Sequence, residues 1–539
     1  MPTLQPETNR HRKLQQGWGG GFAGCAGKPL VVAYGGPSPP TNIDDLLDNM
    51  ESPLTKIDVV NNLNFKVVLE PAKVDFVSLS DPASCIRKLA TVRGGLAIID
   101  DGTLPDLSAL SRVRGIVGPL YIYGRANASL TSLAGLENLQ QVGGLNLAHT
   151  RLQSIAALSK LTVLQGDLVA WDNPALASLA GLQGVTQMYG KLWIDANPLM
   201  ADLSGLQAVQ AIDGDIILRN LDGITSLNGL GSLVSTNGEI LVYGCPRLAS
   251  TRALTNFTSI GIGLVLNDLP ALQDLDGFSR LTGVPGDLQL YLLPALPDLR
   301  GMAGLQQVGL NLVVGANAAL TTLTGLDNLR SVGTLLSVSW NPKLASLQGL
   351  GNLQSIGQDL IIRGNAELTT LADLPRSLRS VGAFRGSEVY IEDNPKLASL
   401  SGLGTGNTAV YGNVTVVGNS PQLPAAEVQA LTTKAVPVPV MTLDLLLHGV
   451  AGIISNTSKP AAANAAAAEA AAAANIAPDA KAATPAQPGV APAAPAAGNA
   501  AVSNASAAAR PAVNGSGATV QPQVAAAPAG AAPVDVASG

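Results

Sequence analysis

The sequence predicts a repeat solenoid, in which a parallel β-helix of about fourteen coils of 24 residues lies between disordered termini. Three observations carry the prediction. An apolar-x-apolar dyad recurs at a fixed spacing from Leu96 to Val416, and a set of leucines recurs at fixed positions after it. The composition is the third, because 47 % of the residues are apolar and only 3 % are aromatic, which indicates an aliphatic core. One such coil cannot bury its apolar side chains alone, whereas stacked coils bury them all.

The first residue of each dyad defines the repeat, and we call it position zero. Every step from Leu168 to Leu360 is 24 residues; the outer steps are 23 to 25, with one of 29 before Val389. Positions +2, +8, +11, +14, +17 and +20 are mostly apolar as well, so each coil sends about seven side chains inward. The dyads begin at Leu96, Leu120, Leu145, Leu168, Leu192, Ile216, Ile240, Leu264, Leu288, Leu312, Leu336, Leu360, Val389 and Val414.

Position +5 is predicted to form a buried ladder of polar side chains that satisfies backbone groups where each strand turns. Leu221, Leu269 and Leu293 interrupt this ladder, so we expect their coils to turn differently or to carry unsatisfied backbone groups. One ladder position is a cysteine, for which we predict a buried structural thiol. The ladder residues are Asn173, Asn197, Cys245, Asn317, Asn341, Asn365, Asn394 and Asn419.

The repeat resembles the receptor L domain, whose pattern G-x-L-x-I-x-x-N-P-x-L-x-S-L-x-G-L is nearly intact in Gly166–Val185 and Ser337–Ile356, and in part in Gly364–Leu374. The resemblance covers residues 86–423 and implies a right-handed, leucine-rich-repeat-like parallel β-helix. That family includes the ligand-binding lobes of insulin- and growth-factor-type receptors and fungal cell-wall proteins. The Cys-rich modules, membrane span and kinase of the receptors have no counterpart here. The resemblance therefore implies a ligand-binding or structural surface rather than a signalling receptor.

Composition divides the chain into five segments. Residues 1–40 are rich in Gly and Pro and are predicted to be disordered, and the amphipathic pieces in 41–85 are predicted to cap the first coil. The solenoid is assigned to 86–423. A second cap is assigned to 424–456, which begins with the helix-like PAAEVQALTTK. In 457–539, 37 of 83 residues are Ala and none is Leu or aromatic, so this tail is predicted to be disordered.

The sequence excludes several classes of function. A net charge of −6, with only 13 % charged residues and no basic stripe, argues against nucleic-acid binding. Three cysteines and three histidines, all scattered, argue against a disulfide framework, a metal site and most hydrolases. No surface gathers an acid, a base and a nucleophile, so we expect neither an enzyme nor a cofactor. No apolar run reaches the roughly 20 residues of a membrane span.

Strand geometry places positions −1, +1 and +3 outward. Position −1 is acidic in six coils, and we predict a solvated edge there because one carboxylate per coil does not supply the six to eight oxygens that Ca²⁺ takes. Trp and Tyr gather at +1 and +3, where they suit binding hot spots, although they are also good strand residues. The acidic residues are Asp167, Asp215, Glu239, Asp287, Asp359 and Glu388. The predicted binding face comprises Tyr121, Tyr123, Trp171, Trp193, Arg219, Tyr243, Tyr291, Trp340 and Tyr390.

These features predict a non-catalytic recognition or structural protein, at the cell surface or extracellular, that binds a protein or glycan partner on its strand face. The alternative is an intracellular leucine-rich-repeat scaffold, for instance one associated with the cytoskeleton. Six N-glycosylation sequons permit the first reading. Scarce cysteines and the lack of a signal peptide favour the second, unless the true start lies upstream of Met1.

Overall fold

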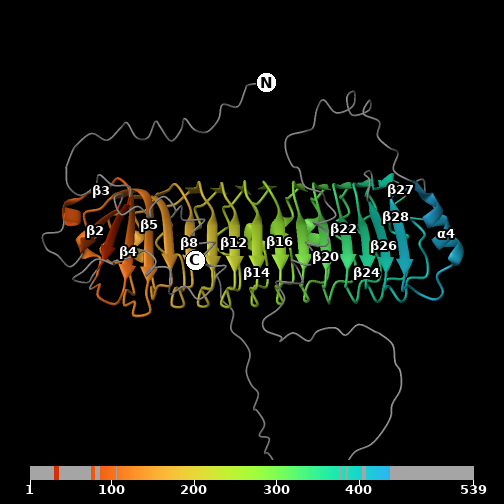
Figure 1. Cartoon of the computed structure of the whole chain (residues 1–539), viewed down its shortest axis with the longest axis horizontal. Coiled ribbons are helices and arrows are strands. Elements are labelled where there is room, and N and C mark those ends of the chain that lie inside the picture. Colours follow the sequence, from red (N-terminus) through yellow and green to blue (C-terminus); the bar gives the residue numbers. More distant parts are fainter. Residues whose placement is uncertain are drawn as a thin grey trace, which may run out of the picture. The chain divides into compact units, whose positions relative to one another are not determined.

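The chain forms a parallel β-solenoid in a computed structural model that describes residues 30–34, 74–78, 85–104, 106–375, 378–382, 387–403 and 408–436 (Figure 1). Fourteen main strands stand side by side, one for each coil, so thirteen turns of chain separate the first from the last. These strands are β4 (Gly95–Asp100), β5 (Gly115–Gly124), β6 (Gln141–Ala148), β8 (Leu168–Trp171), β10 (Leu192–Asp195), β12 (Ile216–Arg219), β14 (Ile240–Tyr243), β16 (Leu264–Asn267), β18 (Leu288–Tyr291), β20 (Leu312–Gly315), β22 (Leu336–Ser339), β24 (Leu360–Arg363), β26 (Glu388–Glu392) and β28 (Asn413–Val417).

Strand pairing is parallel throughout the described residues and joins equivalent positions of the repeat. In the middle of the array each residue lies opposite the residue 24 positions later, as Ile216 lies opposite Ile240. The 29-residue step keeps this register, because Leu360 pairs with Val389 and Ile362 with Ile391. The structure thus confirms the predicted fold class, its period and the number of coils.

A second, narrower ladder precedes the main strand in each coil, and 3-10 helices occupy the far side of several coils. In β5 and β6 the two ladders belong to one long strand. The short strands are β3 (Thr91–Val92), β7 (Val163–Leu164), β9 (Gln187–Met188), β11 (Ala211–Ile212), β13 (Ser235–Thr236), β15 (Ser259–Ile260), β17 (Gly283–Val284), β19 (Gln307–Val308), β21 (Ser331–Val332), β23 (Ser355–Ile356), β25 (Ser380–Val381), β27 (Ala409–Tyr411) and β29 (Ala435–Val436). The 3-10 helices are η5 (Cys85–Lys88), η6 (Ser108–Leu110), η7 (Ala156–Leu158), η8 (Arg252–Leu254), η9 (Asp276–Phe278) and η10 (Arg300–Met302).

One aliphatic core runs through the stacked coils. The leucines at +8, +11 and +14 are buried, as Leu344, Leu347 and Leu350 show in one coil. Two aromatic rings enter this core, where Phe257 and Phe278 of adjacent coils meet edge to face with ring centroids 6.1 Å apart. Burial of these side chains between coils is the main apolar contribution to stability.

The side chains at position +5 form a hydrogen-bonded ladder between coils. Asn341 Nδ2 donates to the carbonyl of Val314, the +2 residue of the preceding coil, at 3.0 Å. Asn341 Oδ1 accepts the backbone N–H of Asn317 at 3.1 Å. The same donation to a +2 carbonyl is made by Asn173, Asn197, Asn317, Asn365, Asn394 and Asn419.

Each coil from β6 to β28 turns on a residue at position +4 with positive φ. Gly244, Gly364 and Gly418 occupy it in three coils, and glycine adopts this left-handed conformation without strain. Asn and Asp tolerate it better than other residues and occupy it in four coils. The non-glycine residues, with φ between 51° and 60°, are His149, Asp172, Ala196, Asn220, Asp268, Leu292, Ala316, Trp340 and Asp393.

The coils that lack a polar +5 residue turn in the same way. Asn220, Asp268 and Leu292 precede Leu221, Leu269 and Leu293 and have φ between 51° and 54°. The expectation of a different turn was therefore wrong, because the left-handed residue at +4 defines the turn whether or not a side-chain amide follows it. Two of the backbone N–H groups find other acceptors. That of Leu269 bonds to the carbonyl of Leu292, and that of Leu293 to Asn317 Oδ1.

Both ends of the main sheet carry additional elements. Leu30–Tyr34, within the segment expected to be disordered, forms β1, which lies between β4 and β2 (Val74–Ser78). At the other end, helix α4 (Ala425–Lys434) packs on the last coils, where Glu427 Oε2 accepts the backbone N–H of Leu400 at 2.6 Å. No described helix is long and apolar enough to cross a bilayer. The predicted tail, 457–539, lies outside the described residues.

One corner of the solenoid brings the backbones of successive coils into direct contact. A Cβ atom added to Gly333 would lie 1.8 Å from the carbonyl oxygen of Gly309, and one added to Gly357 would lie equally close to that of Gly333. Real Cβ atoms do not approach a carbonyl oxygen so closely. Glycine is therefore required here for packing, and this explains part of the high glycine content.

Replacing Gly333 with Ala should lower the free energy of unfolding by about 1–3 kcal/mol, because the added methyl forces two coils apart. Gly351 is the matched control, since an added Cβ there meets no atom within 4 Å. Gly351→Ala should stay within about 0.5 kcal/mol of the original chain. Urea unfolding followed by circular dichroism measures both. Equal stabilities of the two variants would contradict this packing.

Candidate binding face

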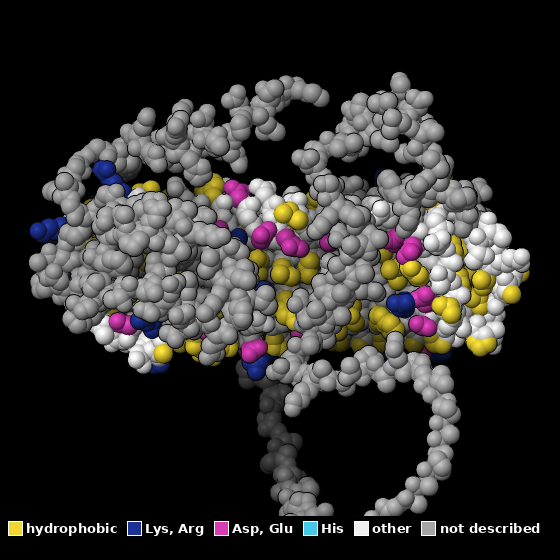
Figure 2. Space-filling view, in the orientation of Figure 1, with side chains coloured by type: hydrophobic (Ala, Val, Ile, Leu, Met, Phe, Trp, Pro, Cys, Tyr) yellow, Lys and Arg dark blue, Asp and Glu magenta, His cyan; other side chains and the backbone are white. Residues whose placement is uncertain are grey.

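Side chains at +1 and +3 of strands β8 to β26 point away from the core and form one surface, which we call the strand face. Acidic and hydrophobic side chains lie beside one another on the described surface (Figure 2). Because equivalent positions pair, each position forms a column along the sheet with one side chain every 4.8 Å or so. From β8 to β26 the +3 column consists of Trp171, Asp195, Arg219, Tyr243, Asn267, Tyr291, Gly315, Ser339, Arg363 and Glu392.

The first ion pair of this column joins β10 and β12. Asp195 Oδ2 lies 3.3 Å from Arg219 Nε, and Asp195 Oδ1 accepts a hydrogen bond from Asn220 Nδ2 at 2.9 Å. The Asp195 side chain is only 4 % exposed. Burial raises its pKa, and the charge of Arg219 partly opposes that rise. Arg219, predicted as a binding residue, thus also neutralises a buried carboxylate of its own chain.

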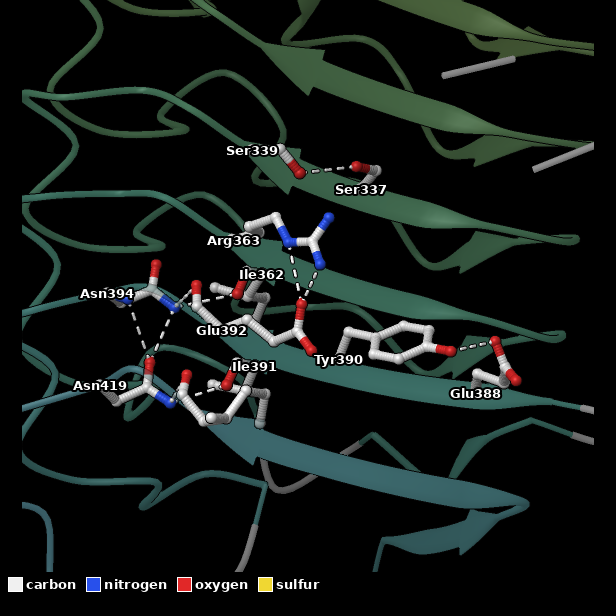
Figure 3. A network of polar contacts seen from close by, with 11 residues as sticks. Ser337, Ser339, Ile362, Arg363, Glu388, Tyr390, Ile391, Glu392, Asn394 and Asn419 are labelled. Carbon is white, nitrogen blue, oxygen red and sulfur yellow. Dashed lines mark hydrogen bonds and ion pairs between the residues drawn. The ribbon is translucent and has the colours of Figure 1, made fainter. Parts of the chain in front are cut away.

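A second polar network lies between β22 and β28 (Figure 3). Arg363 donates through its Nε and Nη2 atoms to Glu392 Oε2, with an Nε distance of 2.9 Å. Tyr390 donates its hydroxyl to Glu388 Oε2 at 2.5 Å, and this bond is the main cause that raises the pKa of Tyr390 to about 12. These polar side chains are held in fixed positions by neighbours on the same strand or the next one.

Three of the predicted binding residues pack closely against the sheet. Trp193 is 6 % exposed, because it lies between Val169 and Ile217 and Lys191 Nζ covers its ring at 4.9 Å from the centroid. Tyr121 is 8 % exposed and stacks on Tyr123, with ring centroids 6.1 Å apart. Burial raises the pKa of both tyrosines, that of Tyr121 to about 12. At these positions the rings serve packing.

Other aromatic rings remain partly accessible and are positioned by the neighbouring coil. Trp171 meets His149 edge to face at 4.3 Å between ring centroids. The ring of Tyr291 lies over Gly315, where an added Cβ would come within 2.8 Å of the ring. Trp340, at +4 and 49 % exposed, lies over Gly364 in the same way. A glycine one coil after an aromatic residue was a signal in the sequence that pattern reasoning missed.

The acidic residues at −1 bind the backbone of the next coil. Asp167 Oδ1 accepts the N–H of Lys191, and Asp215 Oδ1 accepts that of Glu239, both at 2.9 Å. Asp287 and Asp359 make the same contact. The expected solvated edge is therefore a hydrogen-bonded one in these four coils. Among the described residues no group of three His, Cys, Asp or Glu side chains is placed to hold a metal ion.

The ladder thiol of Cys245 lies inside the solenoid. Its Sγ atom is 3.5 Å from the carbonyl oxygen of Tyr243 and 3.9 Å from that of Leu218. Burial is the main cause that raises its pKa to about 12. The thiol therefore stays protonated near neutral pH and is a poor nucleophile.

Comparisons with known proteins do not assign the chain to a family. No family model matches the sequence, and no curated protein matches it either. The resemblance to the receptor L domain stays a prediction, and the functional argument rests on the geometry of the strand face.

Protonation of Glu239 should stabilise the fold, because the pKa of this side chain is raised by burial and by the charges of Asp215 and Asp287. A raised pKa means that the folded chain binds the proton more tightly, so this contribution to stability grows as the pH falls towards the ordinary value of 4.5. Glu239→Gln should therefore raise the melting temperature at pH 7 and have less effect at pH 4. Melting curves at both pH values measure this. An equal shift at both would contradict it.

Proposed function

We propose that the chain is a non-catalytic recognition protein that binds an elongated protein or glycan partner along its strand face. The observation that supports this most is the +3 column, in which three partly accessible aromatic rings lie among polar side chains. Trp171, Tyr243 and Tyr291 supply the rings, and the pair of Asp195 and Arg219 lies between the first two. Such rings stack on sugar rings or on apolar side chains while the polar groups set the register.

Binding without catalysis is favoured because most carboxylates on and beside the strand face already have partners within the chain. On the strand face Asp195 and Glu392 are held in ion pairs, and beside it four of the six carboxylates at −1 accept backbone N–H groups. A carboxylate whose oxygens already accept such bonds has fewer lone pairs left to take a proton from a substrate. The same contacts preorganise the surface, which lowers the entropic cost of binding a partner.

A location at the cell surface or outside the cell belongs to the same proposal. The sequons at Asn127, Asn256 and Asn413 all have exposed asparagines on the described surface. Exposure is what attachment of a bulky glycan requires. The intracellular scaffold remains the alternative, and unmodified sequons on the native protein would favour it.

Alanine at Trp171, Tyr243 or Tyr291 should weaken partner binding at least about tenfold each, because each removes a ring that contacts the partner. Tyr189 is the control, since it is 54 % exposed but lies before β10 and outside the strand face. The full chain is first screened against immobilised polysaccharides and extracellular proteins, and the variants are then measured on the ligand found. Unchanged affinity in all three variants, or an equal loss in Tyr189→Ala, would refute the proposed face.

A further inference from the structure

A groove of ≈ 520 Å³ runs beside the strand face, along the edge where β8, β10, β12, β14 and β16 end. Residues at +4 and +6 line it, so its floor is the row of left-handed turns. Proline occupies +6 in four of the five coils. Because proline has no backbone N–H, these positions offer a bound group an apolar ring and no backbone donor. The groove spans four strand spacings, about 19 Å, which is the length of about six residues of extended chain.

The groove is acidic. Asp172, Asp222 and Asp268 line it, and the side chains of Asp222 and Asp268 make no ion pair within the described part of the chain. No lysine or arginine is among the lining residues. The charges of Asp222 and Asp268 are also among the causes that raise the pKa of Cys245, which lies in the coil between theirs. A bound group is therefore expected to be cationic.

The spacing of these carboxylates argues for a polymer rather than a free metal ion. Asp222 and Asp268 belong to coils two spacings apart, or about 10 Å along the sheet. Two ligands of one Ca²⁺ ion lie at most about 5 Å apart, so one ion does not bridge them. Two cationic side chains on an extended peptide do span that distance, and the proline-lined walls contact the peptide between them.

We propose that this groove binds an extended peptide segment of a partner protein that carries at least two lysine or arginine side chains. The carboxylates of Asp222 and Asp268 bind the cationic groups, and Pro246 contacts the peptide between them. Tyr243 lines the groove as well as the strand face, so the test changes Asp222 and Asp268, which lie outside the strand face.

The test measures fluorescence anisotropy of a labelled eight-residue peptide of alternating lysine and serine, added to the full chain. The double variant with Asp222→Asn and Asp268→Asn should bind at least about tenfold more weakly, and added salt should weaken the original binding. The control combines Asp202→Asn and Asp298→Asn, which changes the net charge equally. Both control residues accept an N–H two residues later, outside the groove.

Two results would overturn the proposal at once: no binding of the peptide, or an equal loss in the groove and control variants, which shows attraction by net charge alone. A third variant tests whether the protein's own basic run, Arg10–Lys13, occupies the groove. In this variant Arg10, Arg12 and Lys13 are replaced by Gln. If the peptide binds this variant but not the original protein, the groove is assigned to that run, and the proposal of a separate partner protein is refuted.

Discussion

Successive coils must lie one strand spacing apart, about 4.8 Å, wherever their strands pair. The rest of the structure depends on this constraint. Glycine is required where the backbones touch, as at Gly333. The amide of Asn341 and the carboxylate of Asp215 bond to backbone groups of adjacent coils that the turns would leave unsatisfied. A left-handed residue at +4 directs each coil into its turn at the same point, so the contacts repeat from coil to coil.

The same constraint produces the surfaces to which we assign function. Because each position forms a column with fixed spacing, a side chain is flanked by its equivalents in the coils before and after it. Arg219 therefore meets Asp195, and the ring of Tyr291 lies over Gly315. At the carboxyl edge of the strands, the row of turns and prolines forms a groove with carboxylates two coils apart. Both surfaces are linear and periodic, and they suit extended partners better than small molecules.

Much of the fold could be predicted because apolar residue types mark the buried positions, and their alternation with polar residues marks the strands. The dyads indicated the period and the register, and the +5 asparagines are buried inside the coil except Asn419, which is half-buried. The rest depends on the neighbouring coil, which a pattern within one repeat does not contain. That Arg219 pairs with Asp195, or that Asp215 accepts an N–H from Glu239, follows only from stacking. The turn at Leu292 was missed because a leucine gives no sign of positive φ.

The central claim is that side chains bonded between coils maintain the stacking, and one amide tests it most directly. The N–H of Asn317 donates to Asn341 Oδ1, so Asn341→Ala removes its acceptor and leaves the core leucines in place. Hydrogen exchange followed residue by residue should show faster exchange at Asn317 and in the coils beside it. Amides in distant coils, such as that of Leu192, which bonds to the carbonyl of Asp215, should keep their rates. An Asn317 amide that exchanges as slowly as before would contradict the claim.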